Sequence, residues 1–509
     1  MRLAPNQTVI LGPPGCGKTT ELLRLLETHL ENGGEAQRIA YFSFTRKAVE
    51  VAKSRAVDRF NITREELPFF RTVHSMVFAL NGHSKNDVIG RAHYAEISDA
   101  LGLSFTGGKV DESTGLPAGN GEGDQHLFLD GLARARRVPL LRQWEELGRT
   151  DIDFRNLERT VTAVTRYKKA NALVDFTDML EIYERDGFPI DVDVAFIDEA
   201  QDLSALQWDV LRRVLQNCET VYVAGDDDQA IYRWSGADVE SFLALEGGQT
   251  VLTQSWRCPQ LVHRIANSIS ERIRYRFTKH WDARAVRGAV TRVNSIDGFD
   301  LAALDGSTLL LARNTYLLTG YTDQLRRRGL AYRTAHGTHS VTRNHAKAIY
   351  AYTRLQKGHA ISGFDAKIVY DHLRAGIGVK RGFKSLPGLS NTADVTEATL
   401  RADYGLLAQG PWYDALDGIS GNDRMYYRSV LRGGGSLLDE PTIQVSTVHG
   451  VKGGEADNVV VCPDMAWQSY QHYERDADDE HRVAYVAVSR AKKHLFLMSP
   501  LTKNFYPYA

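Results

Sequence analysis

One eight-residue segment near the start of the chain restricts the fold more than any other feature. Residues 12–19 read GPPGCGKT and match the pattern G-x-x-x-x-G-K-[ST] at every position. The segment follows an apolar, β-branched run at residues 8–11 and precedes leucines that recur every four residues from Leu22 to Leu30. A glycine-rich loop between a strand and a helix binds phosphate, because backbone N–H groups and the helix N-terminus point at the anion. The segment therefore predicts an α/β fold with a nucleoside triphosphate site.

Further short apolar runs predict more strands, in two clusters along the chain that indicate two α/β cores. They lie at residues 39–44, 194–197, 221–224, 309–312, 443–445 and 459–461. Short, unalternating runs are typical of parallel strands buried on both faces, and helical stretches lie between them. We expect one core from residues 1–80 and 168–256, and a second from 257–345 and 441–509. Residues 81–167 and 346–440 are expected to form mainly helical insertions.

Composition narrows the class of protein. The 509 residues are 43% apolar and 25% charged, which is the ordinary globular range, and the length suggests three to four domains. Apolar runs are all far shorter than the ~18 residues of a membrane span, so no membrane partner is expected. The 62 basic and 63 acidic residues give a net charge of -1, so net charge alone does not indicate a nucleic-acid partner.

The cysteines and the start of the chain indicate a compartment. Cys16, Cys218, Cys258 and Cys462 have no paired spacing, which argues against a disulfide framework or a zinc site. Sparse cysteines suit a reducing compartment, and the first apolar stretch is too short for a signal peptide. We expect a cytoplasmic protein, or a viral protein acting in the host cytoplasm.

The phosphate loop and one acidic pair predict the chemistry of the first core. Lys18 is placed to reach the β- and γ-phosphates, and the Thr19 hydroxyl to hold Mg²⁺. A hydrophobic strand ends at Asp198, a second expected Mg²⁺ ligand, and the adjacent Glu199 is placed to orient or deprotonate the attacking water. The expected ATP-binding residues of the loop are Gly12, Pro13, Pro14, Gly15, Cys16, Gly17, Lys18, Thr19 and Thr20.

Several blocks, taken in order along the chain, resemble the UvrD/Rep/PcrA-like superfamily 1 helicases. The blocks are FTRKA (44–48), TVHS (72–75), DEAQD (198–202), GDDDQAIYRWSGA (225–237), QSWR (254–257), VSTVHGVKGGE (445–455) and AYVAVSRA (484–491). With the phosphate loop they span residues 12 to 491, whereas the two insertions match more weakly. The resemblance implies two RecA-like cores and a DNA-stimulated ATPase that moves 3′→5′ on single-stranded DNA and unwinds duplex DNA, with ATP and Mg²⁺ as cofactors.

The resemblance also implies roles for particular residues. Gln229 would contact the γ-phosphate, Arg257 and Arg490 would be arginine fingers in the second core or at its junction, Trp256 would stack on adenine, and Glu455 would contact the ribose. The residues implied for DNA contact are Phe44, Arg46, His74, Tyr232, Trp234, His449 and Lys452. Because Gln229 lies three to five residues before Tyr232 and Trp234, one short loop is expected to contact both phosphate and bases. Base stacking tolerates any sequence, as a translocating motor requires.

The sequence departs from the family pattern at several positions. Arg233 stands in place of a glycine, Ser235 in place of an arginine, and Arg46 in place of an asparagine. Only eleven residues precede Gly12, so we expect no counterpart of the family's upstream glutamine motif, which reads adenine, and the selectivity for ATP stays open. Two basic stretches, at residues 272–287 and 326–328, are read either as DNA contacts or as solvated helix faces.

Alternative functions remain open at this point. One is an ATP-driven single-stranded DNA translocase or remodelling factor that does not itself unwind. Another is a helicase–nuclease subunit, which the lack of a nuclease-like region after Arg490 disfavours. The block from Gln229 to Trp234 excludes a simple P-loop kinase or GTPase. We expect single-stranded and duplex DNA, together with loading, repair or replication proteins, as partners of a monomer or weak dimer.

Overall fold

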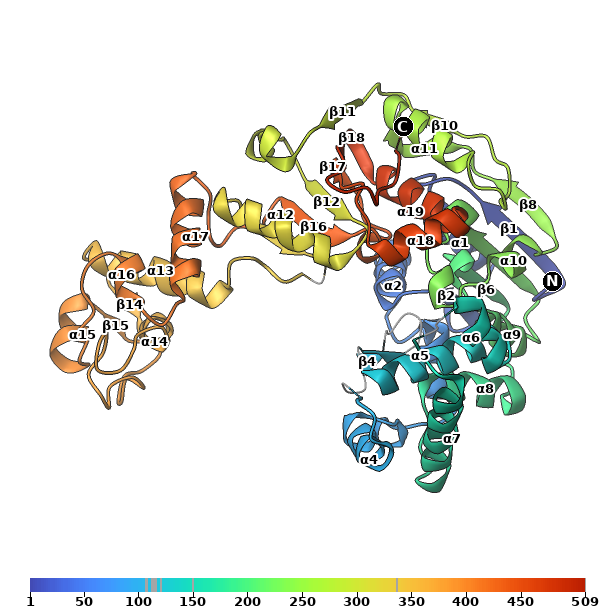
Figure 1. The fold of residues 1–509 in the computed structure, drawn as a ribbon, viewed down its shortest axis with the longest axis horizontal. Helices are drawn as coiled ribbons and strands as arrows, with labels where there is room; N and C mark the ends of the chain where they lie inside the picture. The colour runs from blue at the N-terminus through green and yellow to red at the C-terminus, as the bar shows by residue number, and fades with distance from the viewer. Residues whose placement is uncertain (106–108, 111–116, 120, 149–150, 336, 509) are drawn as a thin grey trace. The chain divides into compact units, whose positions relative to one another are not determined.

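The computed structural model describes residues 1–105, 109–110, 117–119, 121–148, 151–335 and 337–508 (Figure 1). Parts of the expected insertion at 81–167, and residues 336 and 509 of the expected second core, lie outside the described residues. The chain forms two compact units, Met1–Arg287 with Tyr473–Ser489 and Gly288–His472 with Arg490–Ala509.

The first unit contains a six-stranded parallel sheet in the order β3-β2-β6-β7-β1-β8. Its strands are β1 (Asn6–Leu11), β2 (Ile39–Ser43), β3 (Phe69–Arg71), β6 (Val194–Asp198), β7 (Thr220–Gly225) and β8 (Gly248–Val251). Alternate residues of β2 enter different hydrophobic clusters, with Phe42 in one and Tyr41 in the other. The sheet is therefore buried on both faces, which explains the unbroken apolar runs of its strands.

Helices cover both faces of this sheet. They are α1 (Lys18–Glu31), α2 (Arg46–Phe60), α3 (Val73–Leu80), α8 (Phe176–Asp186), α9 (Ala205–Val214) and α10 (Val239–Leu243). Leu22 and Leu26 of α1 pack in the cluster that contains Tyr41, whereas Trp208 of α9 packs in the cluster that contains Phe42. Leu22 and Leu26 belong to the leucine repeat that predicted the first helix.

The segment between α3 and α8 is mainly helical. It contains α4 (Arg91–Leu101), α5 (Glu122–Ala135), α6 (Leu140–Leu147), α7 (Phe154–Ala170) and a short antiparallel pair, β4 (Lys109–Val110) and β5 (Pro117–Ala118). Small clusters of its own hold it together, one of them around Tyr94, Ile97 and Val164.

A part-buried ion cluster connects this helical segment to α8. Arg134 of α5 donates hydrogen bonds to Asp178 (2.6 Å) and Glu181 (2.6 Å), and it pairs with Asp175 at 3.2 Å. Burial works to lower the pKa of Arg134, but the surrounding carboxylates outweigh burial and raise it. The guanidinium therefore stays charged, and it offsets the negative charge that α8 presents to α5.

Replacing Arg134 by Met should destabilise the first unit. The variant leaves Glu181 without Arg134, and it leaves Asp175 and Asp178 with Lys168 as their remaining partner. A missing hydrogen bond to a part-buried charged group costs about 1–3 kcal/mol of unfolding free energy. Urea unfolding followed by circular dichroism measures the change. The control is Arg142→Met, because Arg142 makes an exposed pair with Glu146 on α6. Equal stability of both variants would contradict a fastening role for Arg134.

The first unit also includes segments from later in the chain. These are β9 (Gln254–Pro259), α11 (Gln260–Ser270), β10 (Asp282–Arg284) and α19 (Asp478–Val488). Helix α11 packs on α19, and the Cys258 thiol lies 3.6 Å from the carbonyl oxygen of Ser489. The first unit thus includes residues 257–287 and 473–489, which were expected in the second core. The assignment of four subdomains stays a prediction.

The second unit contains another six-stranded parallel sheet, in the order β11-β18-β17-β12-β16-β13. Its strands are β11 (Ala289–Val293), β12 (Thr308–Ala312), β13 (Tyr332–Thr334), β16 (Ile443–Thr447), β17 (Ala456–Val461) and β18 (Ala491–Met498). Helix α12 (Thr315–Arg327) packs on β12 and β16, and α18 (Trp467–Arg475) follows β17. The expected class, two RecA-like parallel-sheet cores with helical insertions, is confirmed.

The insertion of the second unit has a hydrophobic core of its own. It contains α13 (Arg343–Gln356), α14 (Gly363–Asp371), α15 (Glu397–Asp403), α16 (Trp412–Ala415), α17 (Gly421–Arg432) and the antiparallel pair β14 (Ile361–Ser362) and β15 (Asp394–Val395). These elements gather around buried side chains such as Ile349, Tyr370 and Tyr427, at the left of Figure 1. Among the helices that the structure describes, none has the length and apolar character needed to cross a membrane.

Candidate functional site

The glycine-rich loop connects β1 to α1 as the sequence predicts. Gly15 and Gly17 have φ angles of 71° and 88°, a region that side chains other than glycine rarely adopt. Lys18 is buried, and its ammonium group donates to the carbonyl oxygens of Gly12 (2.8 Å) and Pro13 (3.3 Å). Burial works to lower the pKa of Lys18, but Cys16 and nearby carboxylates outweigh it and raise the pKa. The loop thus keeps a buried positive charge.

The two expected Mg²⁺ ligands lie side by side. The Thr19 hydroxyl donates to Asp198 Oδ2 at 2.6 Å, and the Tyr41 hydroxyl donates to the same oxygen at 2.8 Å. Burial, followed by the charge of Glu199, raises the pKa of Asp198. A hydroxyl and a carboxylate oxygen are hard ligands of the kind Mg²⁺ prefers, so this pair fits the ion.

Glu199 adopts a strained backbone conformation directly after β6. Its φ and ψ are 54° and 38°, the left-handed region that costs a residue with a side chain about 1–3 kcal/mol. The carboxylate accepts a hydrogen bond from Gln201 Nε2 at 2.6 Å, and the Glu199 N–H donates to Asp198 Oδ1 at 3.0 Å. The two neighbouring carboxylates therefore have different hydrogen-bond donors: Gln201 for Glu199, and Thr19 and the Glu199 N–H for Asp198.

A hydrogen-bonded path links this turn to the loop after β7. Gln201 Oε1 accepts from the Asp226 N–H at 3.0 Å, and Gln229 Nε2 donates to Asp226 Oδ2 at 2.7 Å. Strands β6 and β7 are paired in parallel, so the loops after them meet at one edge of the sheet. Sequence reasoning did not single out Gln201 or Asp226, although both follow the carboxyl ends of predicted neighbouring strands.

Strand β9 lies directly against the glycine-rich loop. The Ser255 hydroxyl donates to the carbonyl oxygen of Pro14 (2.7 Å), and the Trp256 N–H donates to that of Gly15 (2.9 Å). A side chain at Gly15 would place its Cβ 2.4 Å from the Cβ of Arg257. The Trp256 side chain is 69% exposed beside this loop. Arg257 belongs to the first compact unit, and its expected place in the second core or at its junction stays a prediction.

The aromatic residues expected to contact DNA form two pairs. Phe44 is buried and packs against Tyr232 with ring centroids 4.9 Å apart. Trp234 is 49% exposed and stacks on Phe128 of α5, with centroids 6.3 Å apart and ring planes at 17°. Phe128 was not predicted, because nothing in its spacing relates α5 to residue 234.

Two of the residues that depart from the family pattern, Arg233 and Ser235, make ion pairs or hydrogen bonds within the first unit. Arg233 pairs with Asp479 at 2.8 Å and with Glu240 at 3.4 Å, and the Ser235 hydroxyl donates to the Tyr232 carbonyl oxygen at 2.8 Å. Gln7 is the one glutamine that precedes Gly12. Its amide donates to the carbonyl oxygens of Met1 (3.2 Å) and Glu246 (2.5 Å).

The remaining first-unit residues expected at DNA occupy different environments. Arg46 is exposed at the start of α2 and lines a hollow of ≈ 700 Å³ together with Lys53 and Arg71. His74 is buried, with its Nδ1 3.4 Å from Gln207 Nε2 and its ring edge-on to Phe176.

Four predicted residues belong to the second unit. Arg490 is buried and donates to the Gly454 carbonyl oxygen at 3.2 Å, and Glu455 pairs with Lys492 at 3.5 Å. His449 and Lys452 lie in the turn between β16 and β17. These positions keep their expected roles as predictions.

Three cations of the basic stretch at 272–287 pair with carboxylates, and its contact with DNA stays a prediction. Arg274 pairs with Asp476 and Asp478, Arg276 with Asp228, and Lys279 with three aspartates. In the second stretch, Arg326 pairs with Asp423. Carboxylates distant in the sequence thus neutralise cations that look unpaired in the linear chain.

Family comparison decides what kind of protein carries this site. The family model for the UvrD/REP helicase N-terminal domain matches residues 2–248, and that for the UvrD-like helicase C-terminal domain matches residues 433–501. Together the two models match more than half of the chain. The chain belongs to the UvrD/Rep helicase family. The resemblance seen in the sequence blocks is therefore confirmed.

Curated relatives of this UvrD/Rep-family chain carry helicase names. The ATP-dependent DNA helicase PcrA of Bacillus subtilis is 26% identical over 203 residues, which cover 35% of this chain and 26% of that protein. PcrA of Staphylococcus epidermidis is 23% identical over 287 residues, or 53% of this chain and 38% of that protein. The ATP-dependent DNA helicase Rep of Buchnera aphidicola is 22% identical over 189 residues, covering 34% and 28%. The matched segments thus span well under half the length of these relatives.

Proposed function

We propose that this chain is an ATP-dependent DNA helicase that moves along single-stranded DNA and unwinds duplex DNA. The observation that supports the proposal best is the hydrogen-bonded path from the Thr19–Asp198 pair through Gln201 and Asp226 to Gln229. The loop that ends this path continues within a few residues to Tyr232 and the exposed Trp234. The 3′→5′ direction is taken from the family resemblance.

The residues around the glycine-rich loop would carry out ATP hydrolysis. Lys18 would bind the β- and γ-phosphates, and Thr19 and Asp198 would hold Mg²⁺, which neutralises charge on the phosphate oxygens. Glu199 would accept a proton from the attacking water, with Gln201 Nε2 orienting its carboxylate. Trp256, exposed beside the loop, would stack on the adenine.

The loop after β7 would couple hydrolysis to DNA. Gln229 would respond to the γ-phosphate, because its amide already belongs to the path that leads to Glu199. A change at Gln229 reaches Trp234 over a short length of backbone, and the Trp234–Phe128 stack presents an aromatic surface for bases. Each stacked base contributes about 1–3 kcal/mol without regard to sequence.

Replacing Trp234 by Ala should weaken the response to DNA. Loss of one base stack, about 1–3 kcal/mol, raises the DNA concentration for half-maximal stimulation about 5- to 150-fold. Steady-state ATP hydrolysis measured against oligothymidylate concentration checks this. Phe188→Ala is the control, because Phe188 is 82% exposed in the same unit but lies outside every motif block. An unchanged concentration dependence for Trp234→Ala would contradict the stacking role.

Two assays on the wild-type protein test the proposed function directly. We expect single-stranded DNA to stimulate ATP hydrolysis, and duplexes with a 3′ tail to be unwound in preference to those with a 5′ tail. Hydrolysis that is indifferent to DNA would overturn the proposal. The DNA repair or replication partners, the monomer or weak dimer and the cytoplasmic location stay predictions.

A further inference from the structure

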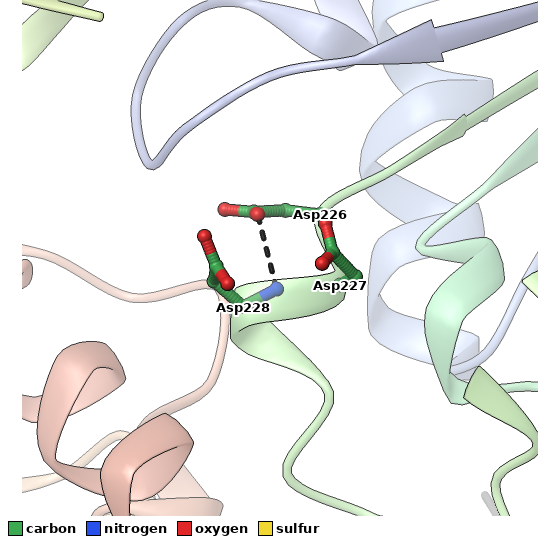
Figure 2. Close-up of side chains that lie close together, drawn as sticks. All are labelled: Asp226, Asp227 and Asp228. Carbon is green, nitrogen blue, oxygen red and sulfur yellow. Dashed lines mark hydrogen bonds between the residues drawn. The ribbon is translucent and has the colours of Figure 1, made fainter. Parts of the chain in front are cut away.

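Three consecutive carboxylates occupy the turn after β7. Asp226, Asp227 and Asp228 are all buried, and oxygens from the three side chains lie within 4.8 Å of one another. Figure 2 shows the three side chains around the turn, with the Asp228 N–H donating to Asp226 Oδ1 at 3.3 Å. Buried carboxylates so close together require a cation or protonation, because unpaired buried charge is strongly unfavourable.

The ammonium group of Lys279 lies among these carboxylates. Its Nζ is 2.9 Å from Asp226 Oδ1, 2.8 Å from Asp227 Oδ1 and 2.8 Å from Asp228 Oδ2, and the side chain is fully buried. The three contacts use all three N–H donors of an ammonium group. Lys279 therefore takes the place that a metal ion would take among such ligands.

Asp226 connects Lys279 to Gln229. Its Oδ1 contacts Lys279, its Oδ2 accepts from Gln229 Nε2 at 2.7 Å, and its N–H donates to Gln201 Oε1 at 3.0 Å. Lys279 and Gln229 thus hold the carboxylate from two sides, and the backbone N–H ties Asp226 to Gln201. A rotation of this carboxylate would move the acceptor that holds the Gln229 amide.

We propose that Lys279 is a positioning residue for ATP hydrolysis, which acts through Asp226 on Gln229. The inference rests on the proposed function, because it gives Gln229 a role at the γ-phosphate. Lys279 itself has no contact with the glycine-rich loop among the described interactions. Its effect is expected on turnover rather than on ATP binding.

Arg276 provides a matched control in the same carboxylate cluster. Its guanidinium donates to Asp228 Oδ1 (2.7 Å) and Oδ2 (2.6 Å), and it makes no described contact with Asp226. Arg276→Met and Lys279→Met each remove one cation from the cluster. Of the two variants, only Lys279→Met removes a described contact to Asp226.

The first experiment compares these two variants by steady-state ATP hydrolysis with oligothymidylate. Loss of a residue that orients a catalytic group typically costs 10–100-fold, so we expect Lys279→Met to lower kcat by about 10–100-fold. The KM for ATP should be unchanged, and Arg276→Met should keep a kcat close to that of the wild type. Equal losses in the two variants would overturn the inference, since they would reflect general disruption of the cluster.

A double-mutant cycle separates positioning from a merely structural role. If Lys279 acts through Gln229, then Lys279→Met should cause no further loss of kcat in a Gln229→Ala background. Additive losses would mean that Lys279 acts independently of Gln229 and would overturn the inference. The cycle is run on both basal and DNA-stimulated hydrolysis. Failure of DNA stimulation in the wild type overturns the helicase proposal, whereas additivity in basal hydrolysis overturns the role of Lys279.

Asp226→Asn tests the same path without removing the buried cation. Asparagine keeps the shape of the side chain, and Lys279 keeps Asp227 and Asp228 as partners, so this variant covers the case in which Lys279→Met does not fold. We expect a kcat loss that is likewise absent in the Gln229→Ala background. A wild-type kcat for Asp226→Asn would overturn the inference.

Discussion

Replacing Arg257 by Ala should lower the kcat of ATP hydrolysis by about 10³- to 10⁵-fold, the contribution of an arginine that stabilises charge in phosphoryl transfer. Arg257 is held beside the glycine-rich loop, because the preceding Trp256 N–H donates to the Gly15 carbonyl oxygen at 2.9 Å. The Ser255 hydroxyl, which contacts Pro14, also accepts from the Arg257 N–H at 3.3 Å. This backbone arrangement supports a role at the phosphates, and the guanidinium would act in the transition state.

Single-turnover hydrolysis and equilibrium binding of a fluorescent ATP analogue separate the two effects of this substitution. We expect the analogue to bind Arg257→Ala with nearly wild-type affinity. Arg264→Ala is the matched control, because Arg264 is exposed on α11, the helix that follows β9. A rise in KM at constant kcat would contradict the prediction and would make Arg257 a ground-state ligand of ATP.

The sheets and their strand-end loops were predictable because both depend on local patterns. Apolar runs buried on both faces predicted β1, β2, β6 and β7, and the sheet brings the loops after these strands together. Thr19 and Asp198 illustrate the result, since the hydroxyl and the carboxylate are 2.6 Å apart although 179 residues separate them. Parallel pairing places the carboxyl ends of the strands at one edge, so strand order alone accounts for this proximity.

Charge pairing between distant segments was not predictable from the sequence. Lys279 lies 52 residues after Asp227 in the chain, within a run of cations that suggested DNA contact or a solvated face. Only the packing of this run against the turn after β7 shows that Lys279 forms ion pairs with Asp226, Asp227 and Asp228. A linear count of basic residues therefore overestimates the cations that remain for DNA in the first unit.

Backbone contacts also extend the first compact unit beyond residue 256. The sequence blocks placed residue 257 at the start of the second core, yet β9 makes hydrogen bonds with the glycine-rich loop and α11 packs on α19. Composition does not change at residue 257, so no local signal marks this continuation. For the same reason the stack of Phe128 on Trp234 was not foreseen, since it depends on where α5 packs.

Glu199→Gln should lower kcat by about 10²- to 10⁴-fold, the usual contribution of a general base. The substitution removes the basic oxygen but keeps nearly the same shape. Glu199 holds a left-handed conformation (φ 54°) and its carboxylate accepts from Gln201 Nε2 at 2.6 Å. A strained turn after a buried strand, together with a donor that orients the carboxylate, is typical of a residue placed for chemistry rather than for stability.

The measurement is single-turnover hydrolysis of ATP with Mg²⁺, with analogue binding as the control for folding. Glu219→Gln is the matched control variant, because Glu219 is exposed just before β7 in the same unit. Analogue binding by Glu199→Gln should match that of the wild type, since Lys18, Thr19 and Asp198 remain in place. If the rate of hydrolysis were also unchanged, the attacking water would have to be activated by a different group, and the path from Glu199 through Gln201 to Gln229 would then have no catalytic end.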